Sequence, residues 1–382
     1  MKTLLTGASV VLAASVLAEA SVLIEDGVIA AIEPAGARGA RRVDLSGRLL
    51  LPGLVDLHCD ALEKELEPRP NARFPLDFAV AQADLRFAAA GITTPFHAIA
   101  FASGELGVRD AATAAALARA VRAHAPQALV DNRVHCRYEI SDAGAAPLLL
   151  RLLDEGAVSL FSLMDHTPGQ GQFKHARDYK DFLAGAYQKS GAQADALLAR
   201  KRGALAAARA RVVELAAAAL KNGVPVASHD DDAPERISAM AALGARISEF
   251  PVNARTAAAA RACGMRTVFG APNILRGGSQ ASSMRALDAV RAGLADCLCA
   301  DYAPASMLAA VFAIVEHGGL DLPAAARLVS LNPARAAGLE NRGEIAAGKR
   351  ADLLVVDVSR RPLRPCQVWA GGRPVLTAGS AR

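Results

Sequence analysis

The chain of 382 residues is 52% hydrophobic and 21% charged, with 31 Gly and 19 Pro, which is ordinary globular composition. It excludes disordered, collagen-like and coiled-coil proteins, and the length allows two or three domains or one large α/β barrel with additions. The net charge is only +5 without a clustered basic stripe, and aromatic residues make up 4% of the chain. We therefore expect no nucleic-acid partner.

Six cysteines form no CxxC pair and no short-spaced framework. This pattern is typical of free thiols in a reducing compartment, so we expect a cytoplasmic protein. After the N-terminal region, no run of about 18 uncharged apolar residues indicates a transmembrane helix, and we expect no membrane partner.

Residues 1–20 (MKTLLTGASVVLAASVLAEA) resemble a secretory signal, with Lys2, an apolar run and a final Ala-Glu-Ala. The alternative is a pair of strands, because glycine at position 7 and Glu19 interrupt the apolar run. The stretch 21–32 then continues through Asp26-Gly27, a hairpin-turn signal. Cleavage after residue 20 would remove the partner of that hairpin, so we favour the strands.

Strand-like and Ala-rich helical stretches alternate along most of the chain. Helices are expected, for example, over 111–124 and 204–221. Alternating β and α units imply parallel strands joined by right-handed crossovers, and eight strands suggest a closed (β/α)8 barrel. An open doubly wound sheet is the alternative, but its Gly-rich dinucleotide fingerprint is absent after the first strand. The eight expected strands lie at 53–57, 91–97, 134–140, 157–166, 224–230, 245–250, 266–271 and 296–301.

Residues 1–50 and 343–382 lack this βα rhythm and contain short strands and turns instead. A strand is expected within 348–357 and a hairpin within 368–376. We therefore expect both termini to pair into one small β domain beside a barrel domain of residues 51–342.

Metal-binding side chains close several otherwise apolar strands. In a parallel barrel the carboxyl ends of the strands form the active-site face, so these side chains should meet at one mouth. Buried carboxylates and imidazoles need compensating charge, which a metal ion supplies. We expect one or two divalent ions (Zn, Mn, Fe, Ni or Mg), since the donor types do not fix the metal. The candidate ligands are His58, Asp60, Glu139, His166, His229 and Asp301.

A single histidine at a strand end is more often just a hydrogen-bonded polar residue than a ligand. For this reason His97, which ends the second expected strand, is left undecided between a substrate contact and a supporting one. No site role is expected for the remaining histidines, His124, His135, His175 and His317.

The segments LLLPGLVDLHCD, NPAR at 332–335 and GEIAAGKRADLLVVD resemble the amidohydrolase superfamily over nearly the whole chain. More narrowly, HCDALEKELEPRPN, SLMDHTPGQGQF, ASHDDD, GAPNILRGGS and ADYAPAS resemble one member family in order along the chain. That family is the α-D-ribose 1-methylphosphonate 5-triphosphate diphosphatases (PhnM) of the carbon–phosphorus lyase pathway. The resemblance implies a metal-dependent hydrolase with a small-molecule triphosphate substrate.

The chain departs from the superfamily pattern in three respects. The usual His-x-His of the first strand is His58-x-Asp60 here, and no lysine closes an expected strand, although many relatives bridge two metals with a carboxylated lysine. Resemblance to Glu-bridged relatives implies that Glu139 takes that place. Glu139 and His166 fall on the third and fourth strands, one strand earlier than in most relatives.

For a diphosphatase, activated water attacks the α-phosphorus and pyrophosphate leaves. The resemblance implies that Asp301 orients this water and takes its proton. Cations must then neutralise the phosphoryl oxygens, and Gly277-Gly278 would allow backbone amides to hold phosphate. The candidate cations are Lys64, Arg69, Arg137, Lys174 and Arg276.

Two other functions stay open at this point. A hydrolase of C–N bonds (deaminase, cyclic amidase or dipeptidase) would use the same chemistry with few cations in its pocket. A non-catalytic barrel scaffold would lack ligand residues, whereas this chain has them. The sequence leaves open whether the protein forms a homo-oligomer.

Overall fold

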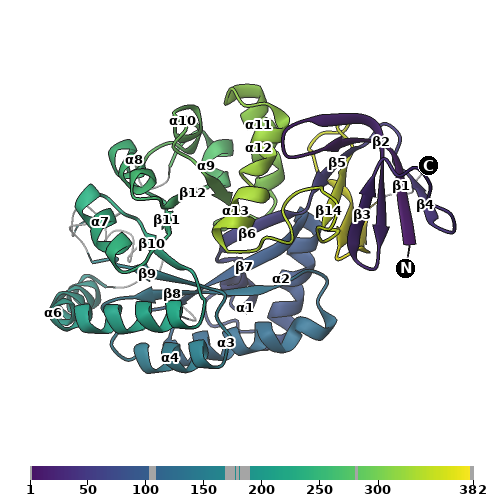
Figure 1. Ribbon diagram of the computed structural model, residues 1–382. Helices are drawn as coiled ribbons and strands as arrows, with labels where there is room; N and C mark the ends of the chain where they lie inside the picture. Colours follow the sequence, from purple (N-terminus) through teal and green to yellow (C-terminus); the bar gives the residue numbers. More distant parts are fainter. Residues whose placement is uncertain are drawn as a thin grey trace.

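The computed structural model describes residues 2–102, 109–167, 177, 180, 190–279 and 283–378. Eight parallel strands form one sheet in sequence order, surrounded by helices (Figure 1). The first and last strands meet where Cys59 and Asp301 form an isolated bridge, which confirms the expected barrel. The strands are β6 (Leu54–Cys59), β7 (Ile92–Phe101), β8 (Arg133–Glu139), β9 (Leu160–Met164), β10 (Val226–His229), β11 (Ile247–Glu249), β12 (Arg266–Gly270) and β13 (Cys297–Cys299).

Each barrel strand overlaps the segment expected from the sequence, so the count of eight is correct. The second strand extends further than expected, because the apolar run continues to Phe101. His97 therefore lies within this strand and not at its end. Glu139 closes the third strand, as expected, whereas the fourth ends at Met164 and His166 lies just beyond it.

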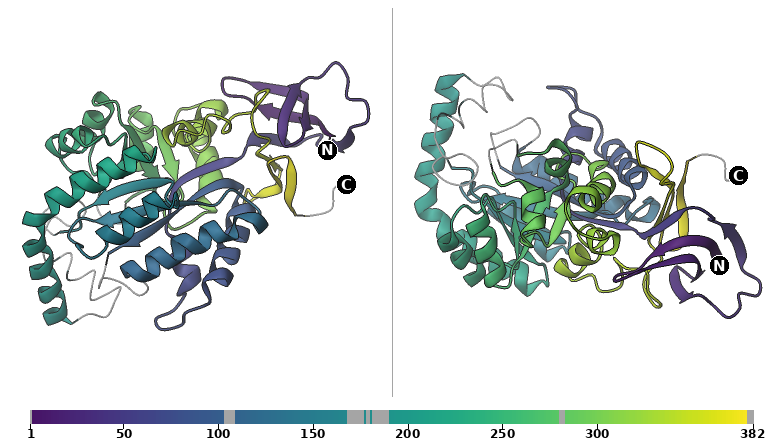
Figure 2. Two further views of the ribbon diagram at one scale, coloured as in Figure 1. Left: turned by 60° about the horizontal axis from the view of Figure 1, so that its bottom comes forward. Right: turned by 90° about the horizontal axis from the view of Figure 1, so that it is seen from above.

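Helices connect the barrel strands and cover their outer face (Figure 2). The helix expected at 111–124 has those bounds, with its N-terminal amides capped by Asp110. The helix expected at 204–221 begins earlier, at residue 191, where Ser190 and Gln193 form a capping box. The first half of this helix has little amphipathic pattern in its sequence, which explains the later start that was expected. The helices in the described ranges are α1 (Ala61–Leu66), α2 (Leu76–Ala90), α3 (Ala111–His124), η1 (Ala125–Gln127), α4 (Ala146–Asp154), α6 (Gly191–Lys221), α7 (Pro234–Ala242), α8 (Ala254–Ala262), α9 (Ala271–Arg276), α10 (Ala286–Arg291), α11 (Ser306–His317), α12 (Leu322–Arg327) and α13 (Leu331–Ala336).

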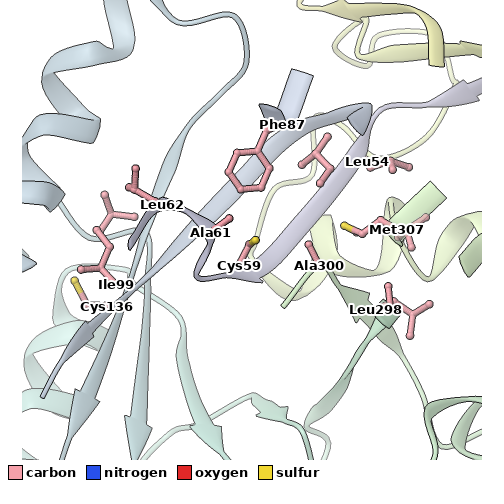
Figure 3. Close-up of a cluster of buried hydrophobic side chains, with 14 of the residues drawn as sticks. Leu54, Cys59, Ala61, Leu62, Phe87, Ile99, Cys136, Leu298, Ala300 and Met307 are labelled. Carbon is pink, nitrogen blue, oxygen red and sulfur yellow. The ribbon is translucent and has the colours of Figure 1, made fainter. Parts of the chain in front are cut away.

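Apolar side chains fill both sides of the barrel wall. Between the strands and helices, Phe87 of α2 and Met307 of α11 belong to the same buried cluster as Leu54 and Cys59 (Figure 3). Inside the barrel, a second cluster includes Val55, Leu57, Phe96, Leu160, Ala227, Ile247 and Val268. Burying such side chains contributes about 1.5–3 kcal/mol each, so the strand ends above this core are held firmly in place.

The strands of both termini form a second sheet beside the barrel, with the N- and C-terminal segments close together (Figures 1 and 2). Its centre joins the two ends of the chain, because β5 pairs antiparallel with β14. Trp369 and Leu50 are buried in its own apolar cluster. The strands are β1 (Lys2–Val11), β2 (Val16–Glu25), β3 (Val28–Ile32), β4 (Arg41–Asp44), β5 (Leu49–Pro52), β14 (Leu353–Val356), β15 (Pro365–Ala370) and β16 (Arg373–Thr377).

The N-terminal segment forms the expected hairpins. Strand β1 pairs with β2, and β2 turns into β3 through Asp26 and Gly27, which have φ of 48° and 87°. Positive φ at both positions is typical of the hairpin turn that Asp-Gly favours. In the part of the chain that the structure describes, no helix is long and apolar enough to cross a membrane.

Candidate active site

A cavity of about 310 Å³ opens at the carboxyl ends of the barrel strands, which is the catalytic face of such barrels. Five of the six expected metal ligands line it, and Glu139 contacts the cavity residue His166 at 3.2 Å. Nine of the lining side chains are acidic, basic or imidazole groups. They are His58, Asp60, Arg109, Arg137, His166, His229, Asp230, Arg276 and Asp301.

His58 reaches this cavity from a distortion in β6. Between Asp56 and Cys59 the register shifts against β7, as in a β-bulge. The Asp56 carboxylate accepts the amides of His58 and Ala300 at 3.2 and 2.9 Å, which fixes the bulge. Burial, followed by the charges of Arg137 and His229, holds the pKa of His58 well below its usual range. The imidazole is therefore neutral, as metal ligation requires.

His166, His229 and Asp230 form a compact cluster at the ends of β9 and β10. Oδ2 of Asp230 lies 3.2 Å from Nδ1 of His229 and 3.7 Å from Nε2 of His166. Asp230 has φ of 55°, a left-handed conformation that turns the chain immediately after the strand. Burial raises the pKa of Asp230, but the two imidazoles outweigh this and hold it below its ordinary value.

The donor atoms form two groups that fit metal ions, and His229 belongs to both. One group is His58, His229 and Glu249, the other His166, His229 and Asp230, with donor atoms within 4.8 Å of one another. Both ring nitrogens of His229 are buried without a hydrogen bond among the described residues. Buried polar atoms left in this state are costly, and a divalent ion would satisfy them. The residues therefore fit the metal that the sequence predicts.

Asp60 and Asp301 lie at the seam where the barrel closes. The Asp60 amide donates to the Asp301 carbonyl, and the Asp301 amide donates to the His58 carbonyl, each at 2.8 Å. Asp301 adopts φ of 56°. Burial and the charge of Asp60 raise the pKa of Asp301 to about 7. A carboxyl group with this pKa can accept a proton near neutral pH.

Two arginines border Asp60. Arg137 lies within β8, and its Nη2 lies 3.8 Å from Asp60 and 3.9 Å from Glu63. Arg109 lies 3.5 Å from Asp60 and 2.8 Å from Glu63. Burial raises the pKa of Glu63, but Arg109 and Arg137 outweigh it and bring that pKa below its ordinary value. The carboxylates thus hold two guanidinium groups at one wall of the cavity.

Another part of the cavity wall comes from the segment that follows β12. Arg276 ends α9 and donates to the Tyr302 hydroxyl at 3.2 Å. Gly277 takes φ of 72°, which ends the helix, and Gly278 and Ser279 then line the cavity. Arg276 and Gly278 of the expected glycine pair therefore border the same space as the histidines, whereas Gly277 does not line it.

Two expected cations lie away from the cavity wall, and a third is not among the described residues. Lys64 lies on α1 and Arg69 on the segment after it, and both are exposed and absent from the cavity wall. Lys174 lies outside the described residues, as does His175. The charge of Lys64 nevertheless acts on Asp60, where it opposes the rise in pKa that burial causes.

Two histidines beside the site have other partners. His97 is fully buried, and its Nε2 lies 2.8 Å from Asn132 Oδ1, away from the cavity wall. His135 contacts the Leu57 carbonyl at 3.0 Å and Ser162 Oγ at 2.9 Å. Burial lowers the pKa of His135 to about 3, so its ring is neutral.

Sequence reasoning missed Glu249, Asp230 and Arg109. Glu249 ends β11 after an apolar stretch, so the rule that selected Glu139 would also have selected it. Asp230 is the first of three consecutive aspartates, and the sequence does not show which one turns inward. Arg109 follows no strand directly, and no pattern distinguishes it.

Comparison with known proteins agrees with this architecture. Residues 49–378 match the family described as "Amidohydrolase family". The chain is 34% identical over 357 residues to α-D-ribose 1-methylphosphonate 5-triphosphate diphosphatase of Escherichia coli (strain K12). That match covers 92% of this chain and 94% of the relative.

Solved structures with the same fold are more distant in sequence. N-acetyl-D-glucosamine-6-phosphate deacetylase from Mycobacterium smegmatis has a TM-score of 0.65 at 20% identity, covering 98% of this chain and 100% of that one. 5-Methylcytosine deaminase from Klebsiella pneumoniae has a TM-score of 0.64 at 16% identity, covering 100% and 99%. At these identities the likeness concerns the fold alone.

Proposed function

The chain belongs to the amidohydrolase family, and from this premise we propose that it is a triphosphate diphosphatase. The substrate is α-D-ribose 1-methylphosphonate 5-triphosphate, and the products are the 5-phosphate and pyrophosphate, in phosphonate catabolism. The activity named for the Escherichia coli relative supports this proposal. Residues 51–342 would form the hydrolase domain, and residues 1–50 with 343–382 the small domain.

The buried guanidinium of Arg137 is the observation that carries the proposal. Its side chain is only 6% exposed, and its Nε and Nη2 make no hydrogen bond among the described residues. Asp60 and Glu63 lie no closer than 3.8 Å to Nη2, so these donors can still bind a further anionic group, and a guanidinium matches phosphate oxygens well. A C–N hydrolase acting on a neutral amide would have no use for this charge.

We assign metal binding to the three histidines of the two groups and to Asp230, with other carboxylates nearby. His58, His166, His229 and Asp230 would hold the ions, with Glu139, Asp60 and Asp301 bordering them. When bound, a divalent ion makes water more acidic and offsets charge on phosphoryl oxygens. The mixture of imidazole and carboxylate donors suits zinc, manganese, iron and nickel better than magnesium.

Asp301 is the proposed general base. It borders the cavity beside Asp60, and its raised pKa suits proton transfer at neutral pH. Asp301 would orient the attacking water toward the α-phosphorus and accept its proton. Pyrophosphate is a stable anion, so it can leave without being protonated by a general acid.

The arginines would bind different phosphate groups of the substrate. Arg137 and Arg109, fixed by Glu63, would bind phosphoryl oxygens near the reacting phosphorus. Arg276 and the amides of Gly277 and Gly278 would hold phosphate at the rim. Lys64, Arg69 and Lys174 remain candidates for contacts farther out along the substrate.

We propose a cytoplasmic location because the six cysteines, four of them buried, are all free thiols. A phosphorylated sugar substrate also fits the cell interior, since it does not cross membranes unaided.

The test is hydrolysis in water enriched in oxygen-18. Metal-loaded protein receives the ribose methylphosphonate triphosphate, its analogue without the phosphonate and a panel of hydantoins. We expect ³¹P NMR to show pyrophosphate and a 5-phosphate that carries the oxygen-18 shift. Label in pyrophosphate would contradict attack at the α-phosphorus, and hydantoin opening without triphosphate cleavage would contradict the proposal as a whole.

A further inference from the structure

Glu249 lies beneath the cavity and holds the ring of His58. It ends β11, is fully buried and does not line the cavity. Its Oε1 lies 2.9 Å from Nδ1 of His58. Phe250, the next residue, packs edge-on against the same ring at a centroid distance of 5.0 Å. The end of β11 therefore contacts His58 through both a polar and an apolar side chain.

The hydrogen bond determines which nitrogen of His58 carries the proton. A carboxylate only accepts hydrogen bonds, so Nδ1 of a neutral His58 must donate to Glu249. The lone pair then belongs to Nε2, and only a nitrogen with a lone pair can bind a metal ion. The other tautomer would place two acceptors 2.9 Å apart in a buried site, which is unfavourable.

His135 does not compete with His58 for this role, although its Nε2 lies 3.6 Å from Glu249 Oε2. The Leu57 carbonyl can only accept, so Nδ1 of His135 donates to it. Nε2 of the neutral His135 ring then accepts from Ser162 Oγ and has no proton to give to Glu249. His58 is the histidine whose proton Glu249 fixes.

We propose that Glu249 is a positioning residue that fixes His58 in its Nδ1–H tautomer and leaves Nε2 as the metal-binding nitrogen. Carboxylates that orient ligand histidines in this way raise metal affinity about 10–100-fold. The inference rests on the metal-binding role proposed for His58. It requires no assumption about the substrate.

The test reads the tautomer directly in metal-free protein. Protein labelled with ¹⁵N-histidine gives two-bond ¹H–¹⁵N correlations that distinguish the two tautomers, and a His58→Gln variant assigns the signal. We expect Nδ1–H for His58 in the unsubstituted protein. Glu249→Leu should abolish this preference and weaken Zn²⁺ binding by about 10–100-fold. Glu249→Gln keeps an acceptor oxygen and should restore the Nδ1–H signal in part.

Asp296→Asn is the matched control, because Asp296 is also a buried carboxylate but lies at the opposite end of the barrel, before β13. It accepts from the Thr267 amide and from Arg261, and its loss should leave the His58 signal unchanged. An Nε2–H signal in the unsubstituted protein, or an unchanged signal in folded Glu249→Leu protein, would overturn the inference. The tautomer signal and the Zn²⁺ affinity can be measured whether or not the enzyme cleaves a triphosphate. Failure of the proposed function would therefore be distinguishable from failure of this inference.

Discussion

Asp60 and Asp301 are joined through their backbones, the amide of Asp60 donating to the carbonyl of Asp301 at 2.8 Å. This bond lies at the closing seam of the barrel, where β6 meets β13. It brings two carboxyl groups from the first and last strands to one side of the cavity. Because like charges oppose each other there, Asp60 adds to the effect of burial and raises the pKa of Asp301.

We expect Asp301→Asn to lower kcat by about 10² to 10⁴, the usual range for loss of a general acid or base. The amide keeps the size of the side chain but cannot accept a proton from water. Turnover is measured by pyrophosphate release, and bound metal by atomic emission on the same preparation.

His229→Ala provides the comparison for Asp301→Asn. It removes a donor common to both candidate metal groups, so bound metal should fall far more than in Asp301→Asn. Near-normal turnover in Asp301→Asn would remove this residue from the mechanism. Complete loss of bound metal in Asp301→Asn would show that the primary role of Asp301 is metal binding.

Arg137→Met should lower kcat/KM for the triphosphate by about 10² to 10³, the range for removal of one buried donor to a developing charge. Methionine fills similar space without the charge, and Arg109 still pairs with Glu63. Arg373→Met, an exposed position on β16, is the control and should leave kcat/KM unchanged. An equal effect of both substitutions would point to a general loss of charge instead of a specific contact.

The barrel and most of the cavity were predictable because strand ends are visible in the sequence. A buried parallel strand appears as an apolar run, and a polar residue that ends it must face the mouth. This reasoning found His229 and Glu139, and applied consistently it would have found Glu249. Side chains placed by loops and helices followed no such rule. Lys64 comes soon after the end of β6, yet it lies on α1, which directs it to the surface.

Gly53→Ala should destabilise the protein by about 1–3 kcal/mol, as expected when a tightly packed position receives an extra methyl group. Gly53 joins β5 of the small sheet to β6 of the barrel, and an added Cβ would lie 2.7 Å from Thr93 Cγ2 and 3.0 Å from Asp352 Cβ. Gly36→Ala is the control, since a Cβ there meets no atom within 4 Å. Urea unfolding of both variants tests this prediction. Equal urea midpoints would show that the backbone around Gly53 shifts to accommodate the methyl group.

The last prediction concerns acid stability and His97. This ring is fully buried, and burial lowers its pKa to about 4, while its bond to Asn132 opposes the shift. In the unfolded chain a histidine has a pKa near 6.5, so between about pH 6.5 and 4 the unfolded state binds more protons. Stability must therefore fall as pH falls through this window, and His97 accounts for about 2 kcal/mol between pH 7 and 5.

His97→Gln tests this in metal-free protein, because glutamine can still donate to Asn132 but cannot take up a proton. The loss of unfolding free energy between pH 7 and 5 should be about 2 kcal/mol smaller than in the unsubstituted protein. His317→Gln, whose side chain is 58% exposed at the end of α11, should keep the full loss. Urea titrations of the three proteins at both pH values give the comparison. If His97→Gln loses as much stability on acidification as the unsubstituted protein, the folded His97 ring takes up a proton as readily as an unfolded one, and burial does not hold it neutral.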